Sequence, residues 1–208
     1  MLLTIHSIEY REPVAAEVLQ PLLHSMPEEI RERVGKYRRW QDAYGCLLGK
    51  YLLRMALQEE GYTGELKELK YSAYGRPYLE NGPDFNISHS GHRVVCIVGR
   101  RGRIGIDLEE IRDLEINDFK DQFSAKEWEI IIKAAEPIKT FYHYWTAKEC
   151  LSKADGRGLN LPLAGLLENH GWNLYPFTFF EHYAGHIAAE EGNYRFTVKE
   201  YSFERAIM

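Results

Sequence analysis

The chain has 208 residues, and its 45% hydrophobic and 27% charged residues are typical of a globular protein with a sizeable core. Its formal net charge of −5 gives no reason to expect nucleic-acid binding. No stretch approaches 18 uninterrupted apolar residues, and the first residues lack the basic and apolar regions of a signal peptide, so we expect no membrane association. The three cysteines have no zinc-site spacing, which favours a reduced, cytoplasmic protein; they are Cys46, Cys96 and Cys150.

The first segments combine a strand with a basic helix. Residues 2–10 predict an opening strand, and Ser25, followed by Pro27 and Glu28, predicts the start of a helix. That helix is expected to carry a basic cluster, Lys36, Arg38 and Arg39. A solvated helix face is the usual explanation of such a cluster.

A longer helix is predicted from Asp42, because apolar side chains recur there with the period of one helical face. These side chains are Tyr44, Leu47, Leu48, Tyr51, Leu52 and Met55. Short strands are then expected over residues 66–72, 85–88 and 94–98, with turns over 74–78 and 88–92.

The second half repeats the order of a strand, helices and strands. Residues 104–110 predict a strand. Ser124 opens a helix in which Glu127 completes a capping box, with Trp128, Ile131 and Ile132 on its apolar side. A helix from Pro137 to about Lys153 follows, and residues 172–204 predict strands with turns near 183–185 and 191–193.

This order predicts an α+β protein built from two similar α+β lobes in one chain. The basic turn from Arg100 to Arg103 lies between the two repeats of the pattern. We therefore expect an N-terminal lobe over residues 1–103 and a C-terminal lobe over residues 104–208, each large enough for its own core.

Two carboxylates stand on one face of the strand predicted over residues 104–110. Asp107 and Glu109 are two residues apart, so their side chains point the same way. Such a pair can hold one hard divalent cation, which prefers oxygen ligands. The alternative is an ordinary acidic turn at the end of a strand.

Four segments in a fixed order resemble the 4′-phosphopantetheinyl transferases, and most closely the two-lobed branch typified by the enzyme that activates surfactin synthetase. The segments are Gly75-Arg76-Pro77, Phe85 to Ser90 (FNISHS), Gly105 to Glu109 (GIDLE) and Trp145 to Lys153 (WTAKECLSK). The resemblance extends from about Lys36 to Leu163, and the last two segments together are the most specific part of it.

The resemblance implies a reaction, a fold and partners. Members of the family move the phosphopantetheine arm of coenzyme A to a serine of an apo acyl, aryl or peptidyl carrier protein and release adenosine 3′,5′-bisphosphate. They need Mg²⁺, for which Mn²⁺ is the alternative. Their two lobes enclose the site within a single chain, so a monomer is expected.

The resemblance also implies catalytic and metal-binding residues. Asp107, Glu109 and Glu149 would hold the cation, and Lys153 would lie beside the diphosphate of coenzyme A. Glu127 would accept the proton of the carrier serine, although its place in a capping box offers a structural explanation. Glu149 acting through a water is the alternative base.

Coenzyme A contacts are expected from a further set of residues that match the family or lie in the basic cluster: Lys36, Arg38, Arg39, Arg76, Ser88, His89 and Lys153. One position departs from the family, because Gly45 stands where a basic residue commonly grips the nucleotide. We expect that grip to come from Arg38, Arg39 or Arg76 instead. Two other functions fit parts of this pattern: a catalytically weak module that binds coenzyme A or carriers, and a different Mg²⁺-dependent phosphotransferase.

Overall fold

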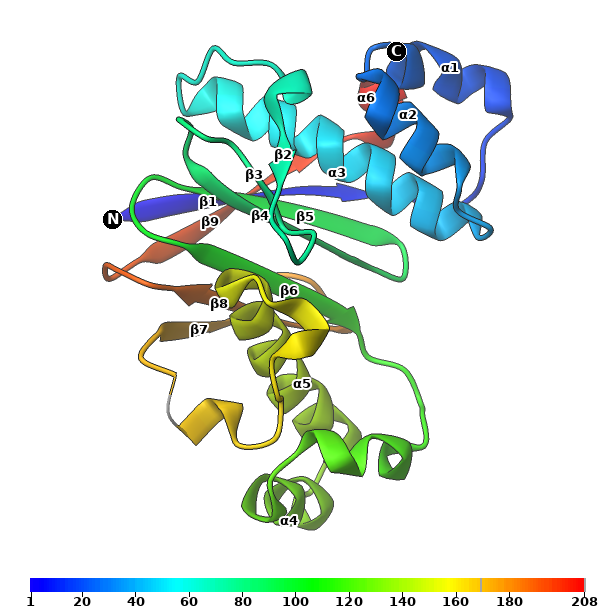
Figure 1. The fold of residues 1–208 in the computed structure, drawn as a ribbon. Helices are drawn as coiled ribbons and strands as arrows, with labels where there is room; N and C mark the ends of the chain where they lie inside the picture. The colour runs from blue at the N-terminus through cyan, green and yellow to red at the C-terminus, as the bar shows by residue number, and fades with distance from the viewer. Residues whose placement is uncertain (169, 208) are drawn as a thin grey trace.

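The computed structural model describes residues 1–168 and 170–207, which form helices packed on two β-sheets (Figure 1). The strands are β1 (Leu2–Glu9), β2 (Lys70–Tyr71), β3 (Pro77–Tyr78), β4 (Asp84–Ser90), β5 (Arg93–Gly99), β6 (Ile104–Glu110), β7 (Asn173–Phe177), β8 (Tyr183–Ala189) and β9 (Arg195–Tyr201). The α-helices are α1 (Ala16–His24), α2 (Glu28–Gly35), α3 (Trp40–Glu59), α4 (Ala125–Lys133), α5 (Pro137–Asp155) and α6 (Phe203–Ile207). Single 3₁₀ segments are η1 (Leu66–Glu68), η2 (Ile116–Gln122), η3 (Gly158–Asn160) and η4 (Leu166–Glu168).

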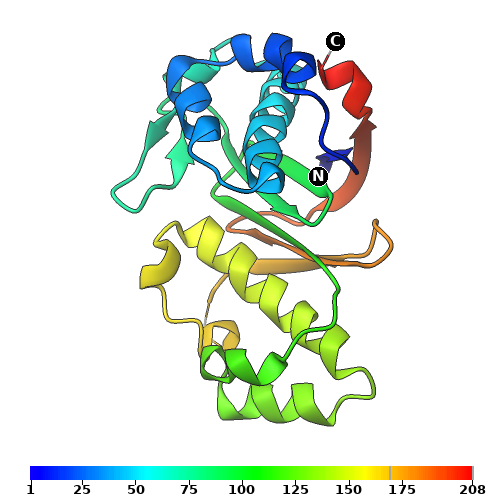
Figure 2. The ribbon, with the colours of Figure 1, turned by 90° about the vertical axis from the view of Figure 1, so that its right-hand side faces the viewer.

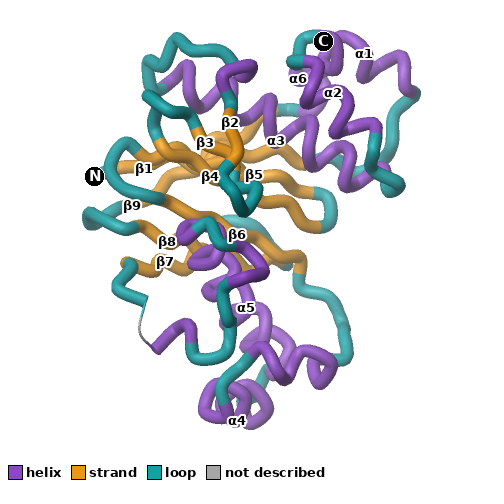
Figure 3. The backbone as a smooth tube through the Cα atoms, in the orientation of Figure 1, coloured by secondary structure: helices purple, strands orange, loops and turns teal. Residues whose placement is uncertain are grey.

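The larger sheet has four strands in the order β4-β5-β1-β9, and the smaller has three in the order β6-β8-β7. All neighbouring strands in these sheets are antiparallel except β1 and β9, which run parallel. A separate hairpin pairs β2 with β3. The strands and helices are mixed along the chain and within the fold (Figure 3), which confirms the predicted α+β class.

The molecule is layered, with a long helix outside each sheet (Figure 2). Helix α3 packs on the four-stranded sheet and α5 on the three-stranded sheet. Between the sheets lies an apolar core that joins Ile5 and Ile97 to Ile106 and Leu108. Because strand side chains alternate faces, β6 buries Ile106 and Leu108 in this core and turns Asp107 towards α5.

The two sheets meet where β4 runs beside β6, and polar side chains join them there. Alternate side chains of β4 accept hydrogen bonds from backbone N–H groups of β6. The pairs are Asp84 with Ile104 (2.7 Å), Asn86 with Ile106 (3.0 Å), Ser88 with Leu108 (3.3 Å) and Ser90 with Glu110 (3.1 Å). These bonds satisfy backbone N–H groups on the edge of β6 and hold β4 and β6 in a fixed register, which positions the residues on both strands.

The sequence predictions for the N-terminal half were partly wrong. Helix α1 was not predicted, and α2 ends at Gly35, so the basic cluster of Lys36, Arg38 and Arg39 follows the helix and does not lie on it. Ser25 does not cap α2, because its hydroxyl donates to the carbonyl of Leu22 instead. The long helix from about residue 42 is confirmed as α3.

Three further details were wrong. Only Lys70 and Tyr71 of the strand predicted over 66–72 pair as a strand, since a 3₁₀ turn occupies its first part. The turn predicted near 183–185 precedes β8, at residues 181–182. Ile132, predicted on the apolar side of its helix, is 50% exposed, whereas Trp128 and Ile131 are buried as predicted.

The division into lobes over residues 1–103 and 104–208 stays a prediction. The strand β9 and the short helix α6 come last in the chain, yet they return to β1 and α1 (Figure 1). Within the described residues, no helix is both long enough and apolar enough to cross a membrane.

Candidate active site

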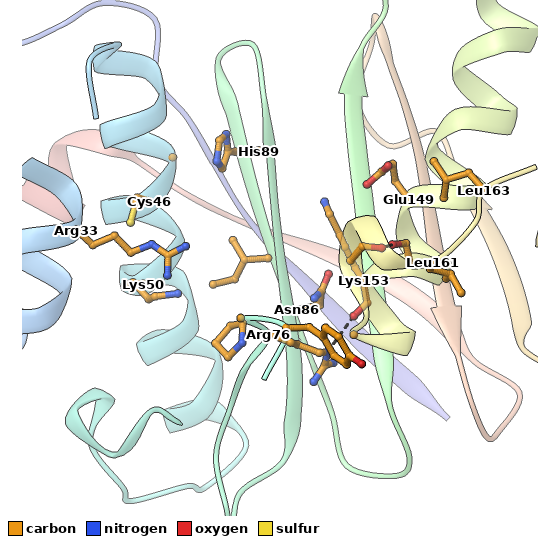
Figure 4. Close-up of a pocket in the computed structure, with 18 of the residues that line it drawn as sticks. Arg33, Cys46, Lys50, Arg76, Asn86, His89, Glu149, Lys153, Leu161 and Leu163 are labelled. Atoms are coloured by element: carbon orange, nitrogen blue, oxygen red, sulfur yellow. Dashed lines mark hydrogen bonds between the residues drawn. The ribbon is translucent and has the colours of Figure 1, made fainter. Parts of the chain in front are cut away.

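A cavity of about 470 Å³ opens between the side of α3 and the C-terminal part of α5. Its walls also include the turn before β3 and the middle of β4. Figure 4 shows Lys50 of α3 and Arg33 of α2 on one wall, and Glu149 and Lys153 of α5 on the other. The cavity also contacts Arg76, so the side chains around it carry more positive than negative charge.

Asp107 and Lys153 form a buried contact at the base of this cavity. The Lys153 ammonium donates to Oδ1 of Asp107 (2.6 Å) and to Oγ of Ser88 (2.8 Å), and Ser88 in turn donates to Oδ1 of Asp107 (2.9 Å). Burial alone would lower the pKa of Lys153, but the nearby carboxylates, Asp107 foremost, more than offset this effect and the pKa is raised. Lys153 therefore carries a full positive charge that partly neutralises Asp107.

Glu109 and Glu149 lie near Asp107, as the sequence predicts. Burial, followed by the charge of Asp107, raises the pKa of Glu109 to about 7, although Ser90 donates a hydrogen bond to it (2.5 Å). The same two causes raise the pKa of Glu149. Carboxylates that raise one another's pKa are poorly neutralised and gain from a nearby cation.

The donor chemistry of these three carboxylates fits a hard divalent cation. Oδ2 of Asp107 is buried and has no hydrogen-bond partner among the described residues, which leaves an oxygen available. Within the same residues, however, no three His, Cys, Asp or Glu side chains already stand in a metal-binding arrangement. The assignment of Asp107, Glu109 and Glu149 as ligands stays a prediction.

Glu127 lies in a buried ion pair. Both of its carboxylate oxygens accept hydrogen bonds from Lys148 Nζ at 2.9 Å, and the Lys148 side chain is fully buried. The capping box predicted between Ser124 and Glu127 is confirmed, with the Ser124 N–H donating to Glu127 at 2.7 Å. The structural explanation of Glu127 therefore has direct support, and its role as a base stays a prediction.

The Arg76 guanidinium makes several hydrogen bonds to other residues of the protein. It makes a bidentate pair with Asp84 (2.8 and 2.7 Å) and donates to the carbonyls of Lys153 (2.9 Å) and Ile104 (3.1 Å). The guanidinium thus ties the β3 turn to β4, β6 and α5. These bonds do not favour the predicted contact of Arg76 with coenzyme A, which stays a prediction.

His89 faces the cavity across from Gly45. Desolvation by the surrounding protein lowers the pKa of His89, and the Lys153 ammonium adds to the effect. A Cβ atom at residue 45 would lie 2.6 Å from the His89 ring, so only glycine leaves this ring where it is. The departure from the family pattern at Gly45 therefore has a steric explanation.

The other predicted contacts lie apart from the cavity. Lys36, Arg38 and Arg39 are exposed, and Arg39 borders a second hollow of about 260 Å³ that also contacts His89. Ser88 is buried, and its hydroxyl is already engaged by Asp107 and Lys153. Their roles in binding coenzyme A stay predictions.

Sequence reasoning missed Lys50 and Arg33 as residues of the cavity. Lys50 lies within α3, beside the apolar residues of its buried face, and a single lysine at such a position usually indicates contact with solvent. The structure instead leaves it only 8% exposed, and burial lowers its pKa. Arg33 lies on α2, and the packing of α2 against α3 brings it to the cavity.

Comparisons with known proteins identify the class of protein. The family model for the 4′-phosphopantetheinyl transferase superfamily matches residues 103–201. The chain is 32% identical over 165 residues to the 4′-phosphopantetheinyl transferase Sfp of Bacillus subtilis, a match that covers 76% of this chain and 73% of the relative. The chain therefore belongs to the 4′-phosphopantetheinyl transferase superfamily, which confirms the resemblance drawn from its motifs.

Other organisms hold further relatives. The chain is 38% identical over 154 residues to the 4′-phosphopantetheinyl transferase HetI of a Nostoc species, covering 68% of this chain and 64% of the relative. It is 30% identical over 172 residues to the L-aminoadipate-semialdehyde dehydrogenase-phosphopantetheinyl transferase of Mus musculus, covering 74% and 55%. The name of each of these relatives describes phosphopantetheinyl transfer.

Proposed function

We propose that this protein transfers the 4′-phosphopantetheine arm of coenzyme A to a serine of an apo acyl, aryl or peptidyl carrier protein. The by-product is adenosine 3′,5′-bisphosphate, and the reaction uses Mg²⁺, with Mn²⁺ as the alternative. The observation that carries the proposal is the cluster of Asp107, Glu109, Glu149 and Lys153 beside a cavity in a chain of this family.

The reaction breaks one bond and forms another at a single phosphorus atom. The serine oxygen attacks the phosphorus that carries the pantetheine arm, and the bond from this phosphorus to the bridging oxygen of the diphosphate breaks. Catalysis of such a step rests on positioning the nucleophile and stabilising negative charge. A divalent cation bound by Asp107, Glu109 and Glu149 would supply part of that stabilisation.

Lys153 supplies a fixed positive charge next to the phosphates. Its ammonium is held by Asp107 and Ser88 on the wall that also presents Glu149. A charge held in place by the protein needs no reorganisation as the leaving group becomes more negative. We therefore assign Lys153 to the stabilisation of the departing bisphosphate.

Glu149 is the better candidate for accepting the serine proton through a water, because its side chain lines the cavity. Glu127, the other candidate, is bound on both oxygens by Lys148 and does not line the cavity. The carrier contributes the nucleophile, so this chain needs no catalytic serine of its own.

The proposal extends to the state of the protein in the cell. Cys46, Cys96 and Cys150 are all free thiols, which agrees with a reducing cytoplasm. The cavity is lined by elements from both halves of one chain, so we propose that a monomer is sufficient for activity.

The test is to follow release of adenosine 3′,5′-bisphosphate by chromatography with and without an apo carrier. We expect one bisphosphate for each carrier modified, a large loss of rate in Lys153→Met, and no loss in Lys139→Met, an exposed lysine on the same helix. Release of bisphosphate without a carrier would indicate a hydrolase and contradict the proposal.

A further inference from the structure

Lys50 is a buried lysine without a carboxylate partner. It is only 8% exposed, and no carboxylate or hydrogen-bond acceptor of the described chain pairs with its ammonium. Taking an ammonium out of water is costly unless an anion compensates it, so buried lysines are normally paired. The other strongly buried lysine, Lys148, has such a partner in Glu127.

The free ammonium borders the cavity of the candidate site. Lys50 lies one helical turn after Cys46, on the face of α3 that lines this cavity, and Arg33 approaches it from α2 (Figure 4). Arg33 lowers the pKa of Lys50 further, because two positive charges stand near each other. Two cations on one wall, with no carboxylate paired to Lys50, form a place for an anion of more than one charge.

The opposite wall is occupied by a separate charged group. Lys153, held by Asp107, lies there with Glu149. Under the proposed function, that wall receives the diphosphate of coenzyme A. The only other strongly anionic group of coenzyme A is the phosphate on the 3′-oxygen of its ribose.

We propose that Lys50, together with Arg33, binds the 3′-phosphate of coenzyme A and makes the enzyme select coenzyme A over the form that lacks this phosphate. This inference rests on the proposed function, because the diphosphate must take the Lys153 wall. It also accounts for Gly45, since the positive charge absent there comes from the next turn of the same helix. Lys50 is thus a specificity residue of the binding site.

The test compares the affinities of coenzyme A and dephospho-coenzyme A by calorimetry. Lys50→Met should weaken binding of coenzyme A about 10- to 100-fold, the range for one lost hydrogen bond to a charged group. The same change should leave the affinity for dephospho-coenzyme A nearly unaltered. Lys50→Arg should retain the selectivity, and Lys126→Met, at an exposed lysine outside the cavity, should change neither affinity.

Thermal unfolding of the ligand-free variants provides a second readout. Replacement of an uncompensated buried ammonium by methionine should leave the midpoint unchanged or raise it. A lowered midpoint would show that Lys50 serves the fold and would overturn the proposal. Equal weakening for both ligands, no weakening for either, or a wild-type protein without preference for coenzyme A would overturn it as well.

Failure of the proposed function gives a different result. A wild-type protein that selects coenzyme A through Lys50 but modifies no apo carrier would refute the transfer reaction and leave the role of Lys50 standing.

Discussion

The buried pair of Glu127 and Lys148 decides between two roles for Glu127. The Lys148 ammonium is fully buried, donates to both Glu127 oxygens and to the carbonyl of Leu163 (2.6 Å), and lies 5.2 Å from the centre of the Phe123 ring. Burial lowers the pKa of Lys148 despite the carboxylate beside it. Glu127→Ala would leave this ammonium without its counter-charge.

Breaking a buried ion pair by removal of one partner costs about 3–5 kcal/mol. For a chain of this length, each kcal/mol lowers the midpoint of thermal unfolding by about 2–4 °C, so Glu127→Ala should lose roughly 6–20 °C. The double variant Glu127→Met/Lys148→Met removes both charges and should recover much of this loss. Calorimetry or circular dichroism on the single and double variants measures the coupling.

Activity measured well below the unfolding midpoint separates structure from catalysis. We expect the double variant to retain a substantial part of its transfer rate, because Glu127 does not line the cavity. A Glu127→Gln variant that unfolds at the wild-type temperature but loses transfer by several orders of magnitude would refute this reasoning and identify Glu127 as the base.

Three further predictions follow from the packing and from one histidine. Gly105→Ala should destabilise the protein by about 1–3 kcal/mol or more, because the new Cβ would lie 2.1 Å from the Cys150 carbonyl oxygen; an unchanged midpoint in a denaturant titration would contradict this. Arg76→Lys should lower both stability and coenzyme A affinity, since lysine cannot reproduce the bidentate pair with Asp84; a variant that loses affinity alone would favour direct contact with the ligand. Burial lowers the pKa of His6 in the folded protein. As the pH drops below about 6.5, the unfolded chain therefore binds a proton at His6 more readily than the folded chain does, and the free energy of unfolding should fall. That contribution, at most about 1.4 kcal/mol per pH unit, should vanish in His6→Gln, and an equal slope in both proteins would contradict it.

Local patterns in the sequence predicted the fold class and the face shared by Asp107 and Glu109, whereas the family resemblance added Glu149 to this pair. The alternation in β6 placed Asp107 and Glu109 on one face, and the period of α5 placed Glu149 and Lys153 on another, so their meeting required only that helix and strand pack together. The capping box at Ser124 was likewise a local signal that the structure confirms.

Features that depend on long-range packing could not be read in this way. Glu127 and Lys148, which pair between α4 and α5, are 21 residues apart in the chain, and the burial of Lys50 depends on strands that follow it. The basic cluster after α2 was assigned to a helix because charge alone does not reveal where a helix ends. The return of β9 to β1 spans almost the whole chain and leaves no local trace in the sequence.

The central claim is the transfer of the phosphopantetheine arm, and the intact mass of an apo carrier tests it most directly. The purified carrier is incubated with this protein, coenzyme A and Mg²⁺, and then weighed by mass spectrometry. We predict a gain of one phosphopantetheine per carrier serine, abolished by EDTA and by Glu149→Ala, and retained with Lys139→Met. No gain on acyl, aryl or peptidyl carriers, from protein that still binds coenzyme A, would contradict the account.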